Sequence, residues 1–281
     1  MQSGILFLDK EAGLTSRKVD NTIGRYFHTK KVGHLGTLDP FATGLLIIGV
    51  NAGNKALRFA RDEEKEYEAT LKLGVSTDTG DLTGVIQEEQ PVPALSQSQI
   101  ETALASLLGK QIQIPPMTSA IKVDGVALYK LAHQGKEIER QGREIEVYES
   151  QLLGVDASTI SFRVKVSKGT YIRTLGEELA RRLGTIGHLI ALRRTAIGPF
   201  RVENAQKLDE IDENSLQNPL QILGHMERFE LDENSYPKAL NGVKLSLPSV
   251  AQEVLLTYRN QAIAVYEKDG EGVYHSLRGL F

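Results

Sequence analysis

Apolar and polar residues recur along this chain with two different periods, which predict strands and helices in irregular order. Period-two alternation or short apolar runs predict strands at 4–10, 44–50, 65–75 and 159–167. Apolar residues at 3.6-residue spacing predict helices at 15–28, 96–109 and 170–184, with a further short helix near 54–62. Because strands and helices do not alternate regularly, the pattern indicates the α+β class.

The pattern of apolar and polar residues changes near residue 225, where helical periodicity ends and short strand-like runs begin. From Phe229 onward, strand-like runs are separated by Pro, Asn-Gln and Asp-Gly turns, which predict a small β-barrel. We therefore expect two domains, at 1–224 and 225–281. Within the first domain, a basic and glycine-punctuated stretch predicts an excursion from the sheet around 117–145.

The composition excludes several kinds of chemistry. The 281 residues include no cysteine, which rules out disulfides, thiolate zinc sites and cysteine nucleophiles and fits a reducing cytoplasm. The first residues lack the basic and apolar segments of a signal peptide, and no apolar run approaches the roughly 20 residues of a membrane helix. We expect a soluble, cytoplasmic protein.

Charge is distributed unevenly along the chain. The whole chain carries −3, yet residues 162–201 hold nine basic and two acidic side chains, a net of +7 that leaves −10 for the remainder. Such polarisation is expected of a cytosolic protein with one anionic partner, and a solvated basic face explains the same count. Residues 225–281 differ, with six basic and eight acidic side chains.

One loop holds a single carboxylate in a restricted setting. In GHLGTLDPFATG, residues 33–44, Asp39 stands before Pro40, which biases the aspartate toward extended backbone and removes the next amide donor. Three glycines in the same loop permit unusual backbone angles and let a ligand approach the main chain closely. The pattern fits a structural turn, which Asp-Pro pairs commonly form, and it also fits a catalytic loop.

A second acidic stretch, STDTGDLTG at 76–84, suggests a metal site at first sight. Asp78 and Asp81 stand among glycine and threonine there, but no histidine or third carboxylate lies at ligand spacing. We interpret the stretch as paired turns that join two strands, and we expect no metal.

Five stretches occur in order along residues 1–201: KVGHLGTLDPFATGLLIIGVNAGNKALRF, KEYEA, QIPPMTSAIKVDGVALYKLAHQG, KGTYIRTLGEELA and GHLIALRRTAIGPF. Together they resemble the TruB family of bacterial tRNA pseudouridine synthases. The resemblance implies isomerisation of uridine 55 in the T loop of tRNA, without cofactor or metal. It implies a catalytic domain with a mixed or antiparallel central sheet flanked by helices, an RNA-binding excursion around 117–145, and a PUA-like module at 225–281.

The resemblance also implies roles for particular residues. The catalytic aspartate falls on Asp39, the base-stacking tyrosine on Tyr67, and the arginine that pairs with the catalytic carboxylate on Arg173. The histidine that helps to extrude the target nucleotide falls on His34. The remaining substrate-binding positions are Tyr171, Leu192, Arg193 and Arg194.

These residue types suit the reaction. Isomerisation breaks an N-glycosidic bond, turns the base and rejoins it through C5, so Asp39 either attacks C1′ or assists through a glycal-type intermediate. An adjacent guanidinium keeps such a carboxylate ionised and oriented. A flat aromatic ring and an apolar wall hold the detached uracil in register, and the Tyr67 hydroxyl is a candidate for moving the C5 proton. The base must first be flipped out, at a cost of a few kcal/mol.

Two positions depart from the family pattern: Glu11, where the family usually has proline, and Thr118, where it often has an aromatic residue. A non-catalytic RNA-binding or tRNA-folding protein on the same scaffold is an alternative, against which intact Asp39, Tyr67 and Arg173 argue. A glycoside hydrolase also acts at C1′, but such enzymes pair two carboxylates, and no second acid stands out in this sequence. We expect a monomer whose partner is the T-loop stem region of tRNA.

Overall fold

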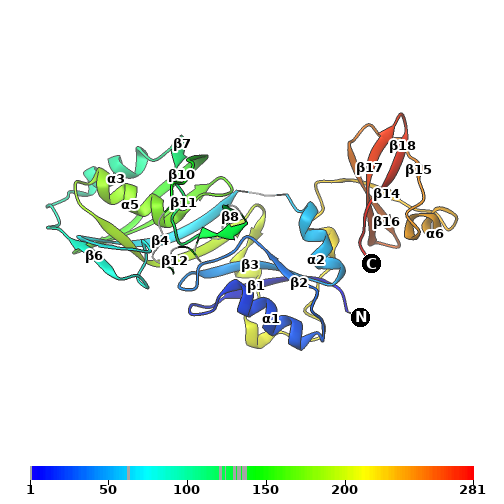
Figure 1. Ribbon diagram of the computed structural model, residues 1–281, viewed down its shortest axis with the longest axis horizontal. Helices are drawn as coiled ribbons and strands as arrows, with labels where there is room; N and C mark the ends of the chain where they lie inside the picture. Colours follow the sequence, from blue (N-terminus) through cyan, green and yellow to red (C-terminus); the bar gives the residue numbers. More distant parts are fainter. Residues whose placement is uncertain are drawn as a thin grey trace. The chain divides into compact units, whose positions relative to one another are not determined.

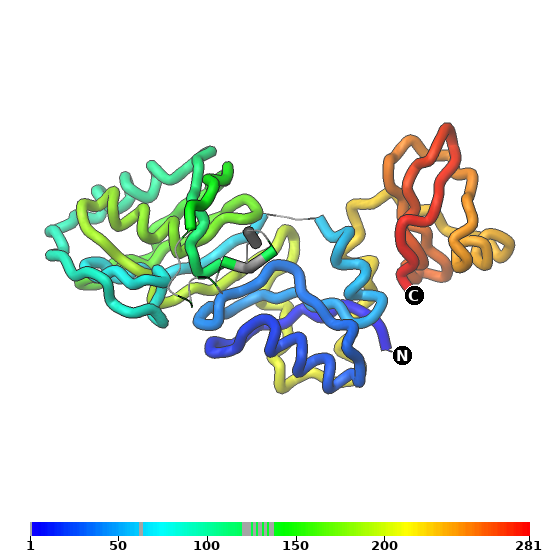
Figure 2. The backbone as a smooth tube through the Cα atoms, viewed as in Figure 1, coloured from blue at the N-terminus to red at the C-terminus, as the bar shows by residue number. Residues whose placement is uncertain are grey.

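The computed structural model describes residues 2–61, 64–119, 122–123, 125–128, 131, 134 and 138–281, and Figure 2 draws the remainder in grey. The chain divides into two compact units. Unit 1 consists of Met1–Pro40, Leu45–Asp62 and Asn204–Phe281, and unit 2 consists of Phe41–Gly44 and Glu63–Glu203. Much of the excursion predicted at 117–145 lies outside the described residues.

Unit 1 opens with three strands and a helix that share one apolar core (Figure 1). Strands β1 (Gly4–Lys10) and β2 (Val32–Leu35) both pair with β3 (Thr43–Val50). Helix α1 (Ser16–Tyr26) buries Val19 and Ile23 against this core, which confirms the predicted helical period. Its N-cap is Thr15, whose Oγ1 accepts a hydrogen bond from the Lys18 amide. A short helix α2 (Ala52–Ala56) and a 3₁₀ turn at Leu57–Phe59 follow β3.

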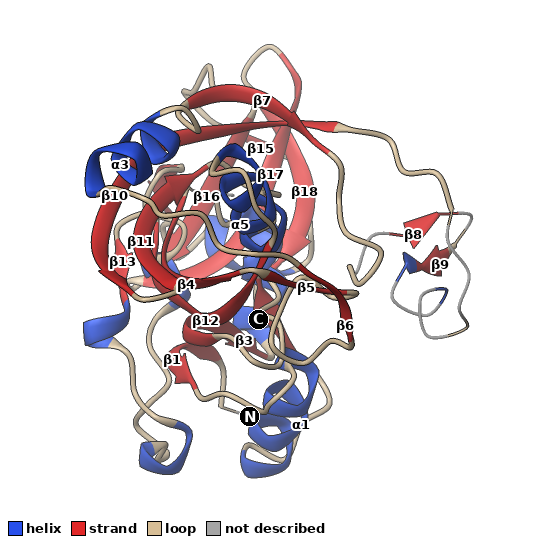
Figure 3. Cartoon of the chain, turned by 90° about the vertical axis from the view of Figure 1, so that its left-hand side faces the viewer, coloured by secondary structure: helices blue, strands red, loops and turns tan. Residues whose placement is uncertain are grey.

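Unit 2 is built on a sheet with helices packed on it (Figures 1 and 3). Its strand order is β12-β4-β11-β10-β7, in which all neighbours are antiparallel. The strands are β4 (Lys65–Leu73), β7 (Gly109–Gln113), β10 (Arg143–Asp156), β11 (Thr159–Val166) and β12 (Gly187–Ile197). The first residues of β3, Thr43 and Gly44, pair in parallel with β12. The sheet is therefore mixed, as predicted.

Two amphipathic helices cover this sheet at predicted positions. Helix α3 (Gln97–Ala105) packs on β10 and begins with a capping box, in which Ser96 and Gln99 satisfy each other's amides. Helix α5 (Ile172–Arg182) packs on β12 and β4. Short strands complete the unit: β5 (Val75–Thr77), β6 (Ile86–Glu89), β8 (Lys122–Val123), β9 (Val126–Ala127) and β13 (Phe200–Arg201). None of the described helices is long and apolar enough to cross a membrane.

The C-terminal residues form a curled five-stranded sheet with order β14-β16-β17-β18-β15. Its elements are β14 (Glu227–Glu230), α6 (Ser235–Leu240), β15 (Leu245–Ser246), β16 (Glu253–Tyr258), β17 (Gln261–Gly270) and β18 (Val273–Gly279). A separate apolar core, which includes Val254, Leu256, Tyr266 and Tyr274, lies under α6 and these strands. The short strands predicted from Phe229 onward are confirmed. Together these sheets and the helices that pack on them confirm the α+β class.

The strands that the sequence pattern does not predict include β2 and β12. Three of the four residues of β2 fall at the start of the glycine-rich stretch 33–44, so turn-type residues hide a strand there. In β12 two consecutive arginines interrupt the apolar run, and one of them, Arg194, is nevertheless fully buried. Hydrogen bonds to neighbouring strands stabilise both β2 and β12, and local sequence carries little information about such pairing.

Candidate functional site

The eight candidate site residues are distributed over both units. His34 and Asp39 belong to unit 1, and the other six belong to unit 2: Tyr67, Tyr171, Arg173, Leu192, Arg193 and Arg194.

Asp39 stands in a loop whose main chain is held immediately before the aspartate. The Ser16 hydroxyl, at the first residue of α1, accepts a hydrogen bond from the Leu38 amide over 2.9 Å and lies 3.1 Å from the Leu38 carbonyl, to which it donates. Both Ser16 and Leu38 are buried. One side chain thus satisfies both main-chain polar groups of a buried residue, which fixes the position of the residue next to Asp39.

The main chain after Asp39 is held as well. The Pro40 carbonyl accepts a hydrogen bond from the Gly13 amide over 2.8 Å and a longer one, 3.4 Å, from the Lys10 amine. Lys10 is almost fully buried and also donates to the Glu11 and Leu14 carbonyls. A buried ammonium must be saturated with acceptors, so Lys10 ties the turn at 11–14 to the peptide that follows Asp39. The half-buried carboxylate is therefore presented by a loop anchored on both sides.

His34 lies on strand β2, and both of its ring nitrogens have partners. Nδ1 lies 2.9 Å from Asp20 Oδ2 and Nε2 lies 3.1 Å from Thr37 Oγ1. A carboxylate only accepts, so Nδ1 carries the proton and donates it to Asp20. Asp20 belongs to α1 and is buried, and no partner among the described residues reaches its Oδ1. A buried carboxylate with one unpartnered oxygen is costly, which indicates a role beyond stability.

Arg173, at the start of α5, is buried and surrounded by acceptors within unit 2. Its Nη1 donates to the Thr79 carbonyl over 2.7 Å and to Thr118 Oγ1 over 2.6 Å, and lies 3.4 Å from Asp81 Oδ2. Its Nη2 donates to the Thr118 carbonyl over 2.9 Å. The planar guanidinium has its donors in a fixed fork, so these contacts determine its orientation. Thr118, where the family often has an aromatic residue, thus contributes both a hydroxyl and a carbonyl.

Asp81 lies in the turn between β5 and β6 and has a structural role there. Its Oδ1 accepts hydrogen bonds from the Thr83 amide and hydroxyl and from the Thr79 hydroxyl, while Oδ2 faces Arg173. Asp78 Oδ1 closes the same turn by accepting from the Val85 amide. The paired-turn interpretation of 76–84 is confirmed. Among the described residues, no cluster of three or more His, Cys, Asp or Glu side chains is placed to hold a metal ion.

The start of α5 is fixed by a single side chain from the edge strand β7. Gln113 is buried and forms two hydrogen bonds to the main chain of Tyr171: its Oε1 accepts from the Tyr171 amide and its Nε2 donates to the Tyr171 carbonyl. Tyr171 is the N-cap residue of α5 and does not cap the helix with its own side chain. Gln113 therefore takes over the positioning of the helix start, two residues before Arg173.

Tyr67 and Leu192 lie on one face of the unit 2 sheet. Tyr67 is opposite Arg194 in the β4–β12 register and Leu192 is opposite Ala69, and directly opposite residues share a face. Because side chains alternate along a strand, Leu71 shares the face of Tyr67. Gly176 of α5 packs against Leu71 and Leu189, so α5 covers this face. The ring of Tyr67, the Leu192 side chain and the helix that carries Arg173 are on the same side of the sheet.

The two neighbouring arginines of β12 differ in their surroundings. Arg194 is 1% exposed, whereas Arg193 is half-buried and its Nη1 lies 3.5 Å from Thr43 Oγ1. Gly44 has φ +104°, and a side chain there would collide with the Arg194 main chain. This close approach requires glycine at position 44 and brings the end of the Asp39 loop against β12 within unit 2.

Most of the basic side chains in 162–201 are neutralised or buried. Arg173 and Arg194 are buried, and five others form ion pairs: Arg163 with Glu68, Lys165 with Glu64, Arg181 and Arg182 with Glu178, and Arg201 with Glu66. Four glutamates offset four of these five charges, since Arg181 and Arg182 share Glu178, and Arg173 and Arg194 are shielded by burial. The surplus of +7 in the sequence overstates the positive surface of this segment, because its acidic partners come mainly from β4 and its flanks.

The sequence pattern did not assign Asp20 or Gln113 to these networks, and it indicated only a turn for Asp81. Asp81 had a weak signal, since an aspartate in TGDLTG is typical of a turn and gives no hint of an arginine 92 residues away. Asp20 had a better one, because a carboxylate next to Val19 on the apolar side of a predicted helix requires a partner.

Comparison with known proteins agrees with these features. Residues 24–172 match the family described as TruB family pseudouridylate synthase (N terminal domain), and residues 173–226 match the tRNA pseudouridylate synthase B C-terminal domain. The chain is 41% identical over 283 residues to tRNA pseudouridine synthase B of Aromatoleum aromaticum, covering 98% of this chain and 92% of that protein. Its identity to tRNA pseudouridine synthase B of Francisella philomiragia is 43% over 235 residues, covering 83% of this chain and 78% of that protein.

The fold has also been seen in solved structures. The crystal structure of a Cbf5-Nop10-Gar1 complex contains a chain that matches 99% of this chain with a TM-score of 0.73, at 21% sequence identity and over 85% of its own length. That likeness concerns the fold, and the sequence identities above define the family. The chain therefore belongs to the TruB family and is a tRNA pseudouridine synthase, an isomerase.

Proposed function

We propose that this enzyme converts uridine 55 in the T loop of tRNA to pseudouridine, with Asp39 as the catalytic carboxylate. The observation that carries the proposal is the anchoring of the Asp39 loop. Hydrogen bonds from Ser16 to Leu38 and from Gly13 and Lys10 to Pro40 hold both flanking peptides. A nucleophile or base held in this way loses little freedom when substrate binds, which favours reaction at a single carbon of the sugar.

Arg173, Tyr67 and Leu192 are proposed to complete the chemistry. The Arg173 guanidinium keeps the Asp39 carboxylate ionised and oriented, in the manner of the family, and its orientation in unit 2 is fixed by Thr79, Thr118 and Asp81. Tyr67 stacks on the uracil, and Leu192 forms the apolar wall against which the base turns. Tyr171 is proposed to line the uracil pocket that Tyr67 and Leu192 form.

His34 is proposed to assist the extrusion of the target nucleotide. Flipping a base out of folded RNA costs a few kcal/mol, and an imidazole inserted into the vacated space recovers part of that cost by stacking. The bonds of His34 to Asp20 and Thr37 support this role, because they hold the ring in one orientation before RNA arrives.

The rest of the chain is proposed to bind the substrate around this centre. We assign residues 1–224 to the catalytic domain, with the RNA-binding excursion around 117–145, and 225–281 to a PUA-like module. Arg193 is the better of the two neighbouring arginines for a direct phosphate contact, because Arg194 is fully buried. We propose that the enzyme acts as a cytoplasmic monomer on the T-loop stem region.

The test is to incubate the purified chain with unmodified tRNA that carries tritium at C5 of uridine. Isomerisation joins C5 to C1′ and releases the C5 hydrogen to water, so the label should be lost from position 55 alone. Nuclease mapping then identifies the position. Unchanged RNA under conditions of demonstrated binding would favour a non-catalytic RNA-folding protein, and free uracil would indicate a hydrolase. Loss of label from another uridine would contradict the assignment of position 55.

A further inference from the structure

A second basic segment of the chain lies on α1 and the loop that follows it, in unit 1. Residues 16–32 contain five basic side chains and one acidic side chain. The charge surplus at 162–201 is larger in the sequence, but ion pairs and burial neutralise most of it. Around α1 the described residues supply one such partner, Asp20, which lies 3.8 Å from Arg17, so most of the positive charge of this segment is available to a partner.

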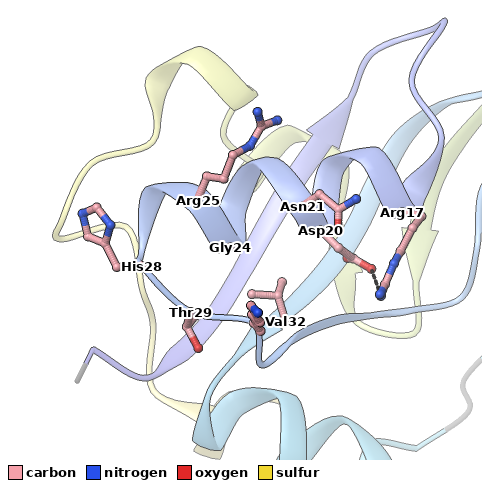
Figure 4. A pocket seen from close by; sticks show the side chains of 9 residues that line it. Arg17, Asp20, Asn21, Gly24, Arg25, His28, Thr29 and Val32 are labelled. Atoms are coloured by element: carbon pink, nitrogen blue, oxygen red, sulfur yellow. Dashed lines mark ion pairs between the residues drawn. The ribbon is translucent and has the colours of Figure 1, made fainter.

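The segment folds into a groove because the chain turns back along the helix. His28, with φ +50°, ends the helical path, and the Thr29 amide then donates to the Gly24 carbonyl over 2.8 Å. A side chain at Gly24 would place its Cβ 2.7 Å from the Thr29 carbonyl oxygen, so glycine is required for this close approach. The returning loop and the helix enclose a groove of about 1000 Å³, whose lining residues are shown in Figure 4.

The basic side chains that line this groove stand toward the two ends of α1, with Asp20 and Asn21 between them. Arg17 lies toward the start of α1 and Arg25 and His28 lie around its end (Figure 4), and Lys30 also lines the groove. Arg25, His28 and Lys30 are exposed, and among the described residues no carboxylate forms an ion pair with them. The single acid in the lining is Asp20, which is buried and is bonded to His34 and, over 3.8 Å, to Arg17. The groove therefore presents uncompensated cations.

We propose that this groove binds the phosphodiester backbone of the substrate tRNA. Cations spread along a trough match a chain of regularly spaced phosphates better than a compact anion, which a single cluster would hold. Arg17 and Arg25 are eight residues apart on one helix, about 12 Å along its axis. That span corresponds to roughly three to four stacked nucleotides at about 3.4 Å each.

The position of Asp20 connects the groove to the proposed flipping residue. Its carboxylate lines the groove and holds His34, so the groove and the imidazole share one residue. An RNA strand bound along α1 therefore lies beside His34, the residue proposed to enter the base stack of the RNA. This inference rests on the proposed function for the identity of the RNA and its target base, while binding to the groove is measured independently of any reaction.

The test compares the salt dependence of tRNA affinity in two double variants. Arg25→Ala with Lys30→Ala removes two cations from the groove, and Arg181→Ala with Arg182→Ala removes two exposed, ion-paired cations from α5 as a matched control. Equilibrium binding of fluorescent unmodified tRNA is measured from low to moderate salt. Each lost phosphate contact lowers the slope of log K against log salt by about 0.7 to 0.9, so the groove variant should lose about 1.5 units of slope. The control should keep the wild-type slope.

A charge-retaining variant, Arg25→Lys with Lys30→Arg, separates charge from shape and should keep most of the slope. Equal slopes for the groove variant and the wild type would overturn the proposal, as would an equal loss in the α5 control. Performing the titrations with Asp39→Asn as the background removes turnover from the measurement. If no label is lost from uridine 55, but the groove variant alone has a lower salt dependence of tRNA affinity, the proposed reaction is wrong and the binding groove stands.

Discussion

Asp20 Oδ2 lies 2.9 Å from His34 Nδ1, so a buried carboxylate on α1 determines which ring nitrogen of a β2 histidine carries the proton. Thr37, on the other side of the ring, is 3.1 Å from Nε2. The two contacts leave His34 one orientation within unit 1. A histidine that must enter an RNA stack benefits from such preorganisation, because less side-chain entropy is lost on binding.

The first prediction is that Asp20→Leu slows base flipping while the fold is retained. Leucine fills the buried position and removes an unpartnered carboxylate oxygen, so the melting temperature should not fall. The His34 ring should then be free to reorient, and the flipping step, followed by a fluorescent base next to the target uridine, should slow about tenfold or more. Nitrogen NMR of His34 should show the proton shifting from Nδ1 toward Nε2. Lys18→Ala, on the exposed side of α1, serves as the control.

A second prediction concerns Thr118, whose hydroxyl accepts from Arg173 over 2.6 Å. Thr118→Val keeps the shape but leaves a buried guanidinium donor without that acceptor, a loss of about 1–3 kcal/mol. We expect a lower kcat with little change in KM, because the residue acts through Arg173 and not through RNA binding. Thr118→Ser restores the acceptor and should recover most of the rate. Equal rates for the valine and serine variants would remove Thr118 from this role.

A third prediction is that Asp39→Asn abolishes turnover and leaves the fold nearly unchanged. Asparagine is nearly the same size and tolerates the same backbone, but it is neither a nucleophile nor a base. Affinity for tRNA should stay within roughly tenfold, about 1.4 kcal/mol, because phosphate contacts dominate binding. Near-wild-type turnover per folded molecule, measured by tritium release, would exclude Asp39 as the catalytic group.

The fourth prediction separates the ring of Tyr67 from its hydroxyl. Tyr67 is 7% exposed on β4. Tyr67→Phe should keep stacking and RNA binding and lose most of the turnover if the hydroxyl moves the C5 proton. Tyr67→Leu should in addition weaken capture of the flipped base, because the flat ring is gone. If both variants turned over at near-native rates, Tyr67 would be a core residue without a part in the chemistry.

The fifth prediction is a pH dependence of stability that originates at Glu178. Hydrogen bonds from Arg181 and then Arg182 hold the pKa of Glu178 below its ordinary value of 4.5. A lowered pKa in the folded state means that the stabilisation is present at neutral pH and is lost as pH falls below about 4.5. Because the cluster is largely exposed, its contribution is about 0.5 kcal/mol. Glu178→Gln should be slightly less stable than wild type at pH 7, and the difference should shrink as the pH falls below about 4.5, as measured by urea unfolding.

The sequence by itself determined the local elements of this protein. The apolar periods at 15–28 and 96–109 predicted α1 and α3, whose N-caps in the structure are Thr15 and Ser96. The order of the motifs indicated the family, and residue types around Asp39 indicated a restricted carboxylate. These features depend on neighbours within a few residues, so hydrophobic burial and capping express them directly in the sequence.

Only the tertiary structure decided which charges meet. Asp81 reaches Arg173 across 92 positions of sequence, and Glu68 neutralises Arg163 across 95. The basic side chains of 162–201, the most basic segment of the sequence, are therefore largely paired. Most of the smaller positive charge around α1 has no acidic partner among the described residues. Charge pairing depends on distance in space, and sheet register sets that distance: β4 brings its glutamates beside β11 and β12. Register arises from the packing of the whole sheet, so no local window of the sequence contains it.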